Sequence, residues 1–440
     1  MAQKNTARAA LWAGGAVCVF CFGCELRGAD MVEKLQQLQE QNQALQEQLR
    51  QQQRQIEALS QKVEALQSAA APTNHAAEEN EPAAPGSASA WSNLGKVHLS
   101  GEGGVAFFDS GSHGQFPHGT FRVDEARLFV EAPVLDDVFF YGEVDLATRE
   151  EPDVEARLGE LYLDVENVSR LWGCERMLSL RAGRIYIPFG EEYQNRFAID
   201  NPLISHSLSD LWGVDEGVEL YGEAGKFNYV VAVQNGGVPD TQDFDGDKSV
   251  AGRVGYDPCH WLHLSLSGMR TGDLDVNGDR MSAMWFGNGF FRSLGSPGTT
   301  KFHVNLVEGD VALRWSQGHL KAFGGGVFYD DNDPTTSQRR DVYYYSVEGV
   351  NDIVGKLYGA VRFSQILAGD GFPVVGNADF GEYMFRELTR GLWRLSLGLG
   401  YRWSPNLVLK AEYSFEEGRE LDGEKREHQD LLAFEAAFRF

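Results

Sequence analysis

The sequence has no long apolar run once its first 29 residues are passed. A transmembrane helix needs about 20 consecutive, predominantly apolar residues, so this absence excludes a helical membrane protein. Without such a helix, a chain can cross a bilayer only as a closed β-barrel, because every backbone N–H and C=O must find a partner inside the membrane. The mean hydropathy is low, which a barrel allows because its inward side chains need not be apolar.

Basic residues are also scarce. The chain of 440 residues has 39 Lys and Arg against 64 Asp and Glu, a formal net charge of −25. Nucleic-acid binding draws much of its affinity from basic side chains on phosphates, so this balance disfavours a nucleic-acid partner. It does not exclude cations as partners or solutes.

Cysteine is rare outside the first residues. Of five Cys, three (Cys18, Cys21 and Cys24) lie in or beside the N-terminal apolar segment, which leaves Cys174 and Cys259. One disulfide is feasible, but isolated Cys in strand-like surroundings are more often small buried residues. We assign them no redox role.

Motifs of known catalytic sites are missing. His206, Ser207 and Asp210 lie close together in the sequence, yet there is no nucleophile elbow, no HExxH motif and no Cys/His constellation. The sequence therefore predicts neither an enzyme nor a cofactor.

Two acidic stretches resemble calcium loops. Asp273, Asp275 and Asn277, followed by Gly278, match the first half of an EF-hand loop, and the stretch 243–247 resembles it loosely. The twelfth position is Met284 in place of the closing Glu. Exposed acidic loops are the favoured interpretation, with weak calcium binding as the alternative. We predict no metal site, and Asp273, Asp275 and Asn277 remain weak candidates.

What the sequence does contain is strict alternation of apolar and polar residues, which is typical of β-strands. Residues 394–403 and 407–416 form a hairpin around Ser404-Pro405-Asn406, and a further strand ends the chain. Runs of roughly ten such residues with aromatics at their ends are typical of transmembrane β-barrels, although a soluble sandwich would look similar strand by strand. The side chains predicted to face outward in these strands are Leu395, Leu397, Leu399, Tyr401, Trp403, Leu407, Leu409, Ala411, Tyr413, Phe415, Leu432, Phe434, Ala436, Phe438 and Phe440.

The N-terminus separates the two alternatives. Residues 1–29 contain Lys4 and Arg8, an apolar stretch over 9–22, and small residues at Gly28 and Ala29, which is the layout of a secretory signal peptide. The mature chain is therefore expected to leave the cytoplasm for a Gram-negative outer membrane. Ordinary cleavage is favoured, and lipidation at Cys24 is the alternative.

A heptad pattern occupies residues 31–67 and predicts an α-helical coiled coil that joins several copies of the chain. Leu35, Leu49, Ile56 and Val63 share the a positions with Asn42, and the d positions over 31–66 are apolar except for Gln52. Buried polar residues of this kind fix register and oligomeric state. Residues 68–90 read as a flexible linker, so the coiled coil and the region 91–440 are separate domains.

Residues 91–440 have room for about 16 antiparallel strands at roughly ten residues each, with short turns alternating with long loops. The fold class is therefore an all-β transmembrane barrel, starting near Trp91. Arg314 and Lys321 are further basic residues on its polar face. The side chains predicted to line its lumen are Arg127, Glu131, Glu143, Asp145, Glu160, Arg253, Arg394, Arg402, Lys410, Glu412 and Glu435.

Three stretches carry a family resemblance. Residues 183–192 (Gly-Arg-Ile-Tyr-Ile-Pro-Phe-Gly-Glu-Glu), the strand 121–130 and the strand around 160–163 are similar to the phosphate-selective porin O and P family, and the likeness spans most of residues 95–440. The resemblance implies a trimeric, 16-stranded barrel in outer-membrane lipid, whose third loop folds inward to constrict the pore. By position, that loop follows Gly190, and Glu191, Glu192 and Arg196 are the candidates for the constriction.

The sequence departs from that family in charge, because the stretch around Gly190 has no Lys. A phosphate pore needs clustered cations to replace the water of the anion. We therefore expect a diffusion channel for small hydrophilic or ionic solutes, with mixed charge in the lumen and a weak preference for cations. The alternative is a barrel that only anchors the envelope through its coiled coil.

Overall fold

The computed structural model describes residues 97–149, 156–239, 242–243, 246–278, 280–287, 289–294, 297–372, 374–376 and 389–440. The predicted signal peptide, coiled coil and linker lie outside these residues, as does the expected start of the barrel at Trp91.

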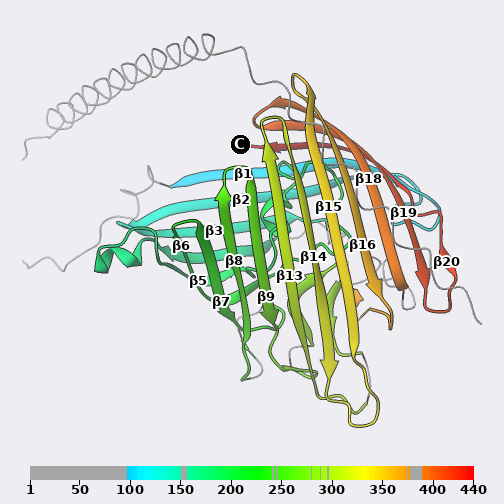
Figure 1. Ribbon diagram of the computed structural model, residues 1–440, viewed down its shortest axis with the longest axis horizontal. Coiled ribbons are helices and arrows are strands. Elements are labelled where there is room, and N and C mark those ends of the chain that lie inside the picture. Colours follow the sequence, from blue (N-terminus) through cyan, green and yellow to red (C-terminus); the bar gives the residue numbers. More distant parts are fainter. Residues whose placement is uncertain are drawn as a thin grey trace, which may run out of the picture. The chain divides into compact units, whose positions relative to one another are not determined.

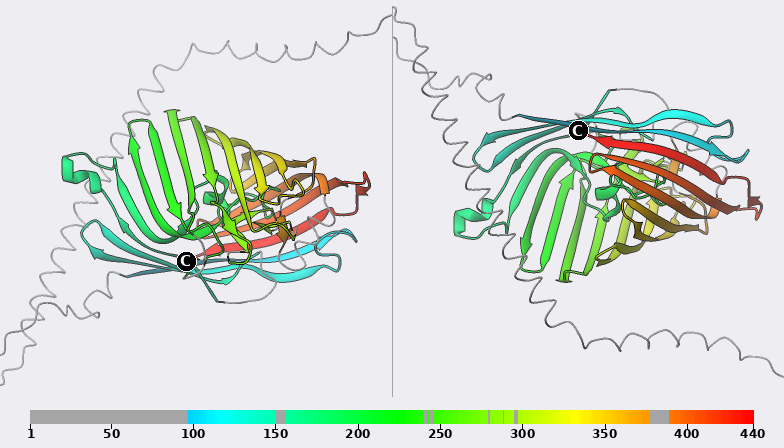
Figure 2. Two further views of the ribbon diagram at one scale, coloured as in Figure 1. Left: turned by 90° about the horizontal axis from the view of Figure 1, so that it is seen from below. Right: turned by 90° about the horizontal axis from the view of Figure 1, so that it is seen from above.

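Within the described chain, 16 strands form a closed antiparallel barrel (Figure 1). Each strand pairs with the next along the chain, and the last, β21, pairs with β1 from Glu102↔Arg439 to Ser110↔Leu431. Figure 2 shows this closure, with the red β21 beside the blue β1. The strands are β1 (His98–Ser110), β2 (Thr120–Leu135), β3 (Val138–Ala147), β4 (Arg157–Val165), β5 (Ser179–Tyr186), β6 (Val214–Ala224), β7 (Phe227–Gln234), β8 (Ser249–Cys259), β9 (Leu262–Arg270), β13 (Lys301–Trp315), β14 (Gly318–Asp331), β15 (Arg340–Val354), β16 (Leu357–Ala368), β18 (Thr389–Ser404), β19 (Leu407–Glu420) and β21 (Leu431–Arg439). The short β10 (Leu274–Asp275) and β20 (Lys425–Arg426) extend the same sheet.

The two ends of the barrel differ in their connections. At one end most strands are joined by tight turns, such as that between β6 and β7, where Gly225 has a φ of 66° that favours glycine. The β4–β5 connection at the same end is longer. The C-terminus lies at this end, because Arg439 N–H donates to the carbonyl of Asn406 in the β18–β19 turn (3.1 Å). The other end carries the longer connections. Short turns mark the periplasmic end of outer-membrane barrels.

The described residues contain two short 3-10 helices, η2 (Val168–Trp172) and η3 (Glu192–Asn195). No helix in this part of the chain is long and apolar enough to cross a membrane.

The predicted alternation is confirmed. Leu397 and Leu399 are 42% and 52% exposed, whereas Ser396, which directly precedes Leu397, is 1% exposed. Phe434 and Phe438 face outward in the same way. A closed barrel whose outer face is an apolar band is built to be surrounded by lipid, so the barrel prediction and the outer-membrane location are confirmed and the sandwich is wrong.

One part of the inner face is apolar, which the sequence analysis did not predict. A three-stranded sheet of β11 (Met281–Phe286), β12 (Gly289–Arg292) and β17 (Val374–Gly376) comes from the β9–β13 and β16–β18 connections. Its Phe286 and Phe291 are fully buried in one cluster with wall residues such as Val304 and Ile366. This second sheet therefore packs on the inner wall at the end of the barrel that carries the long connections.

Candidate functional site

The connection between β5 and β6 folds into the barrel, and we call residues 187–213 the inward loop. Its ends meet at the wall, where Ile187 N–H donates to the carbonyl of Gly213 (2.8 Å). Gly190 turns the chain with a φ of 68°, and a Cβ there would lie 2.3 Å from Glu308 Oε1 on β13. Glycine is thus required at Gly190 by both φ and space. The loop occupies the position that the family resemblance implied.

Strand β19 holds the inward loop on the far side of the barrel. The Glu412 carboxylate accepts the N–H groups of Ile204 (2.5 Å) and Ser205 (2.9 Å), and the Ser205 hydroxyl as well. Beside it, the Lys410 ammonium donates to Glu435 on β21 (2.7 Å). Glu412, Lys410 and Glu435 are only 3%, 5% and 4% exposed. These predicted lumen residues do point inward, but the loop covers them, so they anchor the loop.

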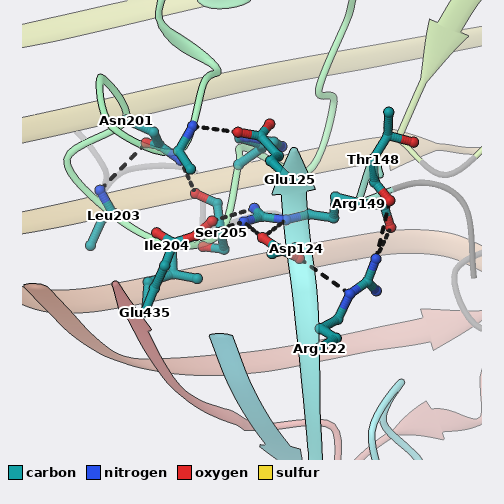
Figure 3. A network of polar contacts seen from close by, with 12 residues as sticks. Arg122, Asp124, Glu125, Thr148, Arg149, Asn201, Leu203, Ile204, Ser205 and Glu435 are labelled. Atoms are coloured by element: carbon teal, nitrogen blue, oxygen red, sulfur yellow. Dashed lines mark hydrogen bonds and ion pairs between the residues drawn. The ribbon is translucent and has the colours of Figure 1, made fainter. Parts of the chain in front are cut away.

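A β-bulge in β2 supplies a second anchor. The register against β1 shifts there, and two consecutive carboxylates, Asp124 and Glu125, are both buried on the inner side. Glu125 accepts the N–H of Ala198 (2.6 Å). Asp124 accepts from Arg149 Nε (2.8 Å), and Arg149 also donates to the carbonyl of Ile204 (Figure 3). Alternation alone would have sent one of the two acids outward.

Arg196, predicted at the constriction, is 1% exposed. Its guanidinium donates to both carboxylate oxygens of Asp210 (3.0 and 3.3 Å) and lies 4.3 Å from the centroid of the Trp212 ring. Burial alone would raise the pKa of Asp210, but the charges of Arg196 and His206 lower this pKa below its usual range. Both partners are therefore charged at neutral pH, and Arg196 fixes the fold of the loop.

Arg362 on β16 is a loop contact that the sequence analysis missed. It donates to the carbonyl of Ser205 (2.6 Å), to Asn201 Oδ1 (2.8 Å) and to Glu348 on β15 (3.0 Å). It is 6% exposed. Because Arg362 is next to the outward Val361, alternation along the strand could have placed Arg362 on the inner face. Nothing in the sequence links Arg362 to the inward loop.

Buried ion pairs also link the side chains of the inner wall near β2–β5. Arg127 lies within 3.2 Å of Glu143 and 3.3 Å of Asp145, and it stacks on the ring of Phe197 from the loop at 4.4 Å. Arg127 and Glu143 are 3% and 1% exposed. Of these predicted lumen residues, only Asp145 keeps appreciable contact with solvent.

The remaining predicted lumen residues lie on inward positions with different partners. Glu131 is exposed on β2. Glu160 accepts the N–H of Tyr186 (2.9 Å), and Arg253 donates to the carbonyl of Gly190 (2.5 Å). Arg394 pairs with Glu416 (2.6 Å), and Arg402 pairs with Asp352 (2.6 Å).

Two cavities flank η3, and Gln194 lines both. The β13 cavity, of about 590 Å³, is lined by Glu191 and Glu192 of the loop and by Arg314 and Lys321 on the wall, among others. The β6 cavity, of about 600 Å³, extends from η3 to the β4–β5 connection. Both reach residues of the short-turn end of the barrel, so they are expected to open toward the periplasm.

The β13 cavity contains charges of both signs. Glu191 accepts from His263 (2.7 Å), and Glu192 accepts the N–H of Ser207 (2.9 Å). Arg314 and Lys321, in contrast, form no ion pair within the described ranges of the chain. Two wall cations therefore share this cavity with two loop carboxylates.

Residues that could suggest catalysis do not come together as a nucleophile and base. The His206 ring nitrogens face the carbonyl of Arg196 (2.9 Å) and the carboxylate of Asp210 (3.4 Å). The Ser207 hydroxyl instead donates to Glu192 (2.5 Å). His206 is thus not placed to take a proton from Ser207.

The weak metal candidates use their oxygens within the loop. Asp273 pairs with Arg270 (2.8 Å). Asp275 accepts the N–H groups of Asn277 (2.8 Å) and Gly278 (3.2 Å), which is an Asx turn. His303 Nδ1 lies 3.4 Å from Asp273, but among the described residues no group of three acidic or histidine ligand atoms includes Asp273 or Asp275.

Comparisons with known proteins match the barrel to solved structures of similar fold. No protein-family model matches the chain, and no curated protein matches it. Solved structures do. A loop L8 deletion mutant of OmpT, an outer membrane protein of Vibrio cholerae, has a TM-score of 0.52 at 15% identity, covering 78% of this chain and 99% of that one. The outer membrane channel DcaP of Acinetobacter baumannii has a TM-score of 0.52 at 14% identity, covering 78% and 97%. The chain thus shares the barrel fold of these outer-membrane proteins, and the phosphate-selective family remains a resemblance.

Proposed function

We propose that the protein is an outer-membrane porin, a passive diffusion channel for small hydrophilic or ionic solutes with a weak preference for cations. The observation that carries this proposal is the inward loop, whose Glu191 and Glu192 line one cavity together with Arg314 and Lys321 of the wall. A channel that filters by size needs such a constriction, and charges of both signs across it act on passing ions. Asp310 adds a further carboxylate to the cavity, whereas Glu348 and Asp352, which also line it, pair with arginines.

Phosphate selectivity is not part of the proposal. Replacing the water shell of phosphate requires several cations that are free to bind it. Arg127, Arg196 and Arg362 are instead bonded to carboxylates and buried by the inward loop. Among the described residues, only Arg314 and Lys321 line the β13 cavity as Arg or Lys side chains without a close ion pair, and Lys321 lies across from Glu348 on β15.

Reversal potentials of the purified protein in planar bilayers, measured across a KCl gradient, test the proposal. We expect a small potential of the sign that indicates cation preference. Replacing both loop acids (Glu191→Gln with Glu192→Gln) should shift it toward anions, because the cavity then keeps its two wall cations.

The matched control replaces the opposing cations, Arg314→Gln with Lys321→Gln, and should shift the potential toward cations. An unchanged potential in both double variants would place the selective charges elsewhere. Strong block of the current by phosphate in the unmodified pore would contradict the assigned selectivity. A protein that inserts but conducts no ions would instead favour the envelope anchor.

The proposal includes a homotrimer, and one feature of the outer wall supports contact between copies. Arg184 on β5 pairs with Glu216 on β6. Glu216 shares the outward face of β6 with Leu220, which is 41% exposed. A charged side chain facing lipid costs up to about 2–4 kcal/mol, depending on depth. A neighbouring copy would remove this cost, since the pair would then face protein.

A further inference from the structure

The β6 cavity differs in chemistry from the β13 cavity, although the two are of similar size. Its lining contains four tyrosines, four glutamates and three arginines, whereas no tyrosine lines the β13 cavity. Its volume of about 600 Å³ is typical of small-molecule sites. The composition therefore suits a ligand with both apolar and hydrogen-bonding surfaces.

The arginines of the β6 cavity are already paired. Arg181 donates to Asp164 (2.8 Å) and Glu219 (3.1 Å), and Arg176 donates to Glu223 (3.0 Å). Arg253 lies 3.9 Å from Glu191. Because no guanidinium lacks a carboxylate and the acids outnumber the bases, the cavity does not favour an anion.

A cation is disfavoured for a second reason. Arg181 lies 4.4 Å from the centroid of the Tyr221 ring, and Arg253 lies 5.6 Å from that of Tyr193. Guanidinium groups thus already occupy these rings, so an incoming cation would meet like charge there.

Neutral hydroxyl groups fit this arrangement better than ions do. A hydroxyl both donates and accepts. It can therefore donate to the carboxylate of an ion pair and accept from an N–H of the guanidinium partner. Tyr186 and Tyr193 stack with centroids 5.7 Å apart, which covers the faces that they turn to each other. The rest of each side chain lines the cavity and provides apolar contact for the C–H groups of a ring.

We propose that the β6 cavity is a retention site for neutral, ring-shaped, polyhydroxylated solutes, that is, monosaccharide-like sugars. The proposal rests on the proposed pore function and deepens it. Sugars would adsorb beside η3, while the unpaired charges of the β13 cavity act on ions. Tyr193 on η3 lies at the border of the two cavities, next to Gln194, which lines both.

The test is the ion current of the full-length protein in planar bilayers during addition of D-glucose. D-sorbitol, which has the same number of carbons and one more hydroxyl but no ring, is the matched solute. We expect glucose to reduce the current saturably, and sorbitol to reduce it only in proportion to viscosity. Tyr193→Ala should raise the half-saturating glucose concentration about tenfold, the equivalent of one lost contact, whereas Tyr193→Phe should keep most of the effect because the ring remains.

Lys321→Ala in the β13 cavity is the matched variant, and it should change the reversal potential but leave the glucose effect unchanged. Conduction by each variant shows that it has folded. Equal effects of glucose and sorbitol, or an unchanged glucose effect in Tyr193→Ala, would overturn the retention site while leaving the pore intact. If the protein conducts no ions at all, the pore proposal fails, and calorimetric titration of the detergent-purified protein with glucose decides the site separately.

Discussion

Removing the Glu412 carboxylate should release the inward loop from the wall. This carboxylate is 3% exposed and accepts the backbone N–H groups of Ile204 and Ser205 at 2.5 and 2.9 Å. Hydrogen bonds to a charged group contribute about 1.5–3 kcal/mol each, so losing both weakens the anchor by about 3–6 kcal/mol. At 1.4 kcal/mol per factor of ten, Glu412→Ala should accelerate amide exchange at both positions by about 10² to 10⁴-fold.

Hydrogen–deuterium exchange of the purified protein, followed by mass spectrometry of peptides from residues 196–210, measures this effect directly. Glu417→Ala is the control, because Glu417 lies on the same strand but is exposed on the outer side. Exchange in the control should match the unmodified protein. If Glu412→Ala exchanges no faster than the control over these residues, the loop is not held by this carboxylate.

Two further predictions concern the second sheet and the N-terminal helix. Phe291 is fully buried against Phe286, with ring centroids 5.7 Å apart. Phe291→Ala, a kind of change that typically costs about 3–5 kcal/mol, should therefore raise amide exchange over β11 and β12 without changing that of β19. Equal exchange in the variant and the unmodified protein would mean that the sheet does not depend on this core. A peptide of residues 31–66 should sediment as a trimer, because the family resemblance implies three copies, although Asn42 at an a position favours two; a monomer at high concentration would contradict the coiled coil.

Much of the barrel could be predicted because lipid imposes a simple pattern. Outward residues such as Leu397 and Phe434 must be apolar, and their neighbours alternate inward with period two. The hairpin 394–416 and the final strand were therefore identified from the sequence alone. The same pattern gave the inward direction of Lys410 and Glu412, because direction depends only on register along one strand.

The contacts of those side chains could not be predicted, because they depend on segments distant in the sequence. Glu412 bonds to Ser205, which lies 207 residues away. Alternation with the polar His303 and Asn305 would have sent Val304 outward. Val304 is instead buried on the inner face, because a sheet built from two separate connections covers it there. The bulge that buries Asp124 with Glu125 breaks the period on which the prediction relied.

These contacts change how the charge of the lumen should be counted. A tally of inward charges treats Lys410, Glu412 and Glu435 as equal contributors to selectivity, yet each is buried and bonded within the wall or to the loop. The field of a closely paired, buried charge is largely cancelled by its partner, so it contributes little to the potential met by a passing ion. Under the proposed function, selectivity then depends on the few charges that face the β13 cavity, namely Glu191 and Glu192 together with Arg314 and Lys321. Substitutions among the buried pairs should change the position of the loop before they change the sign of the preferred ion.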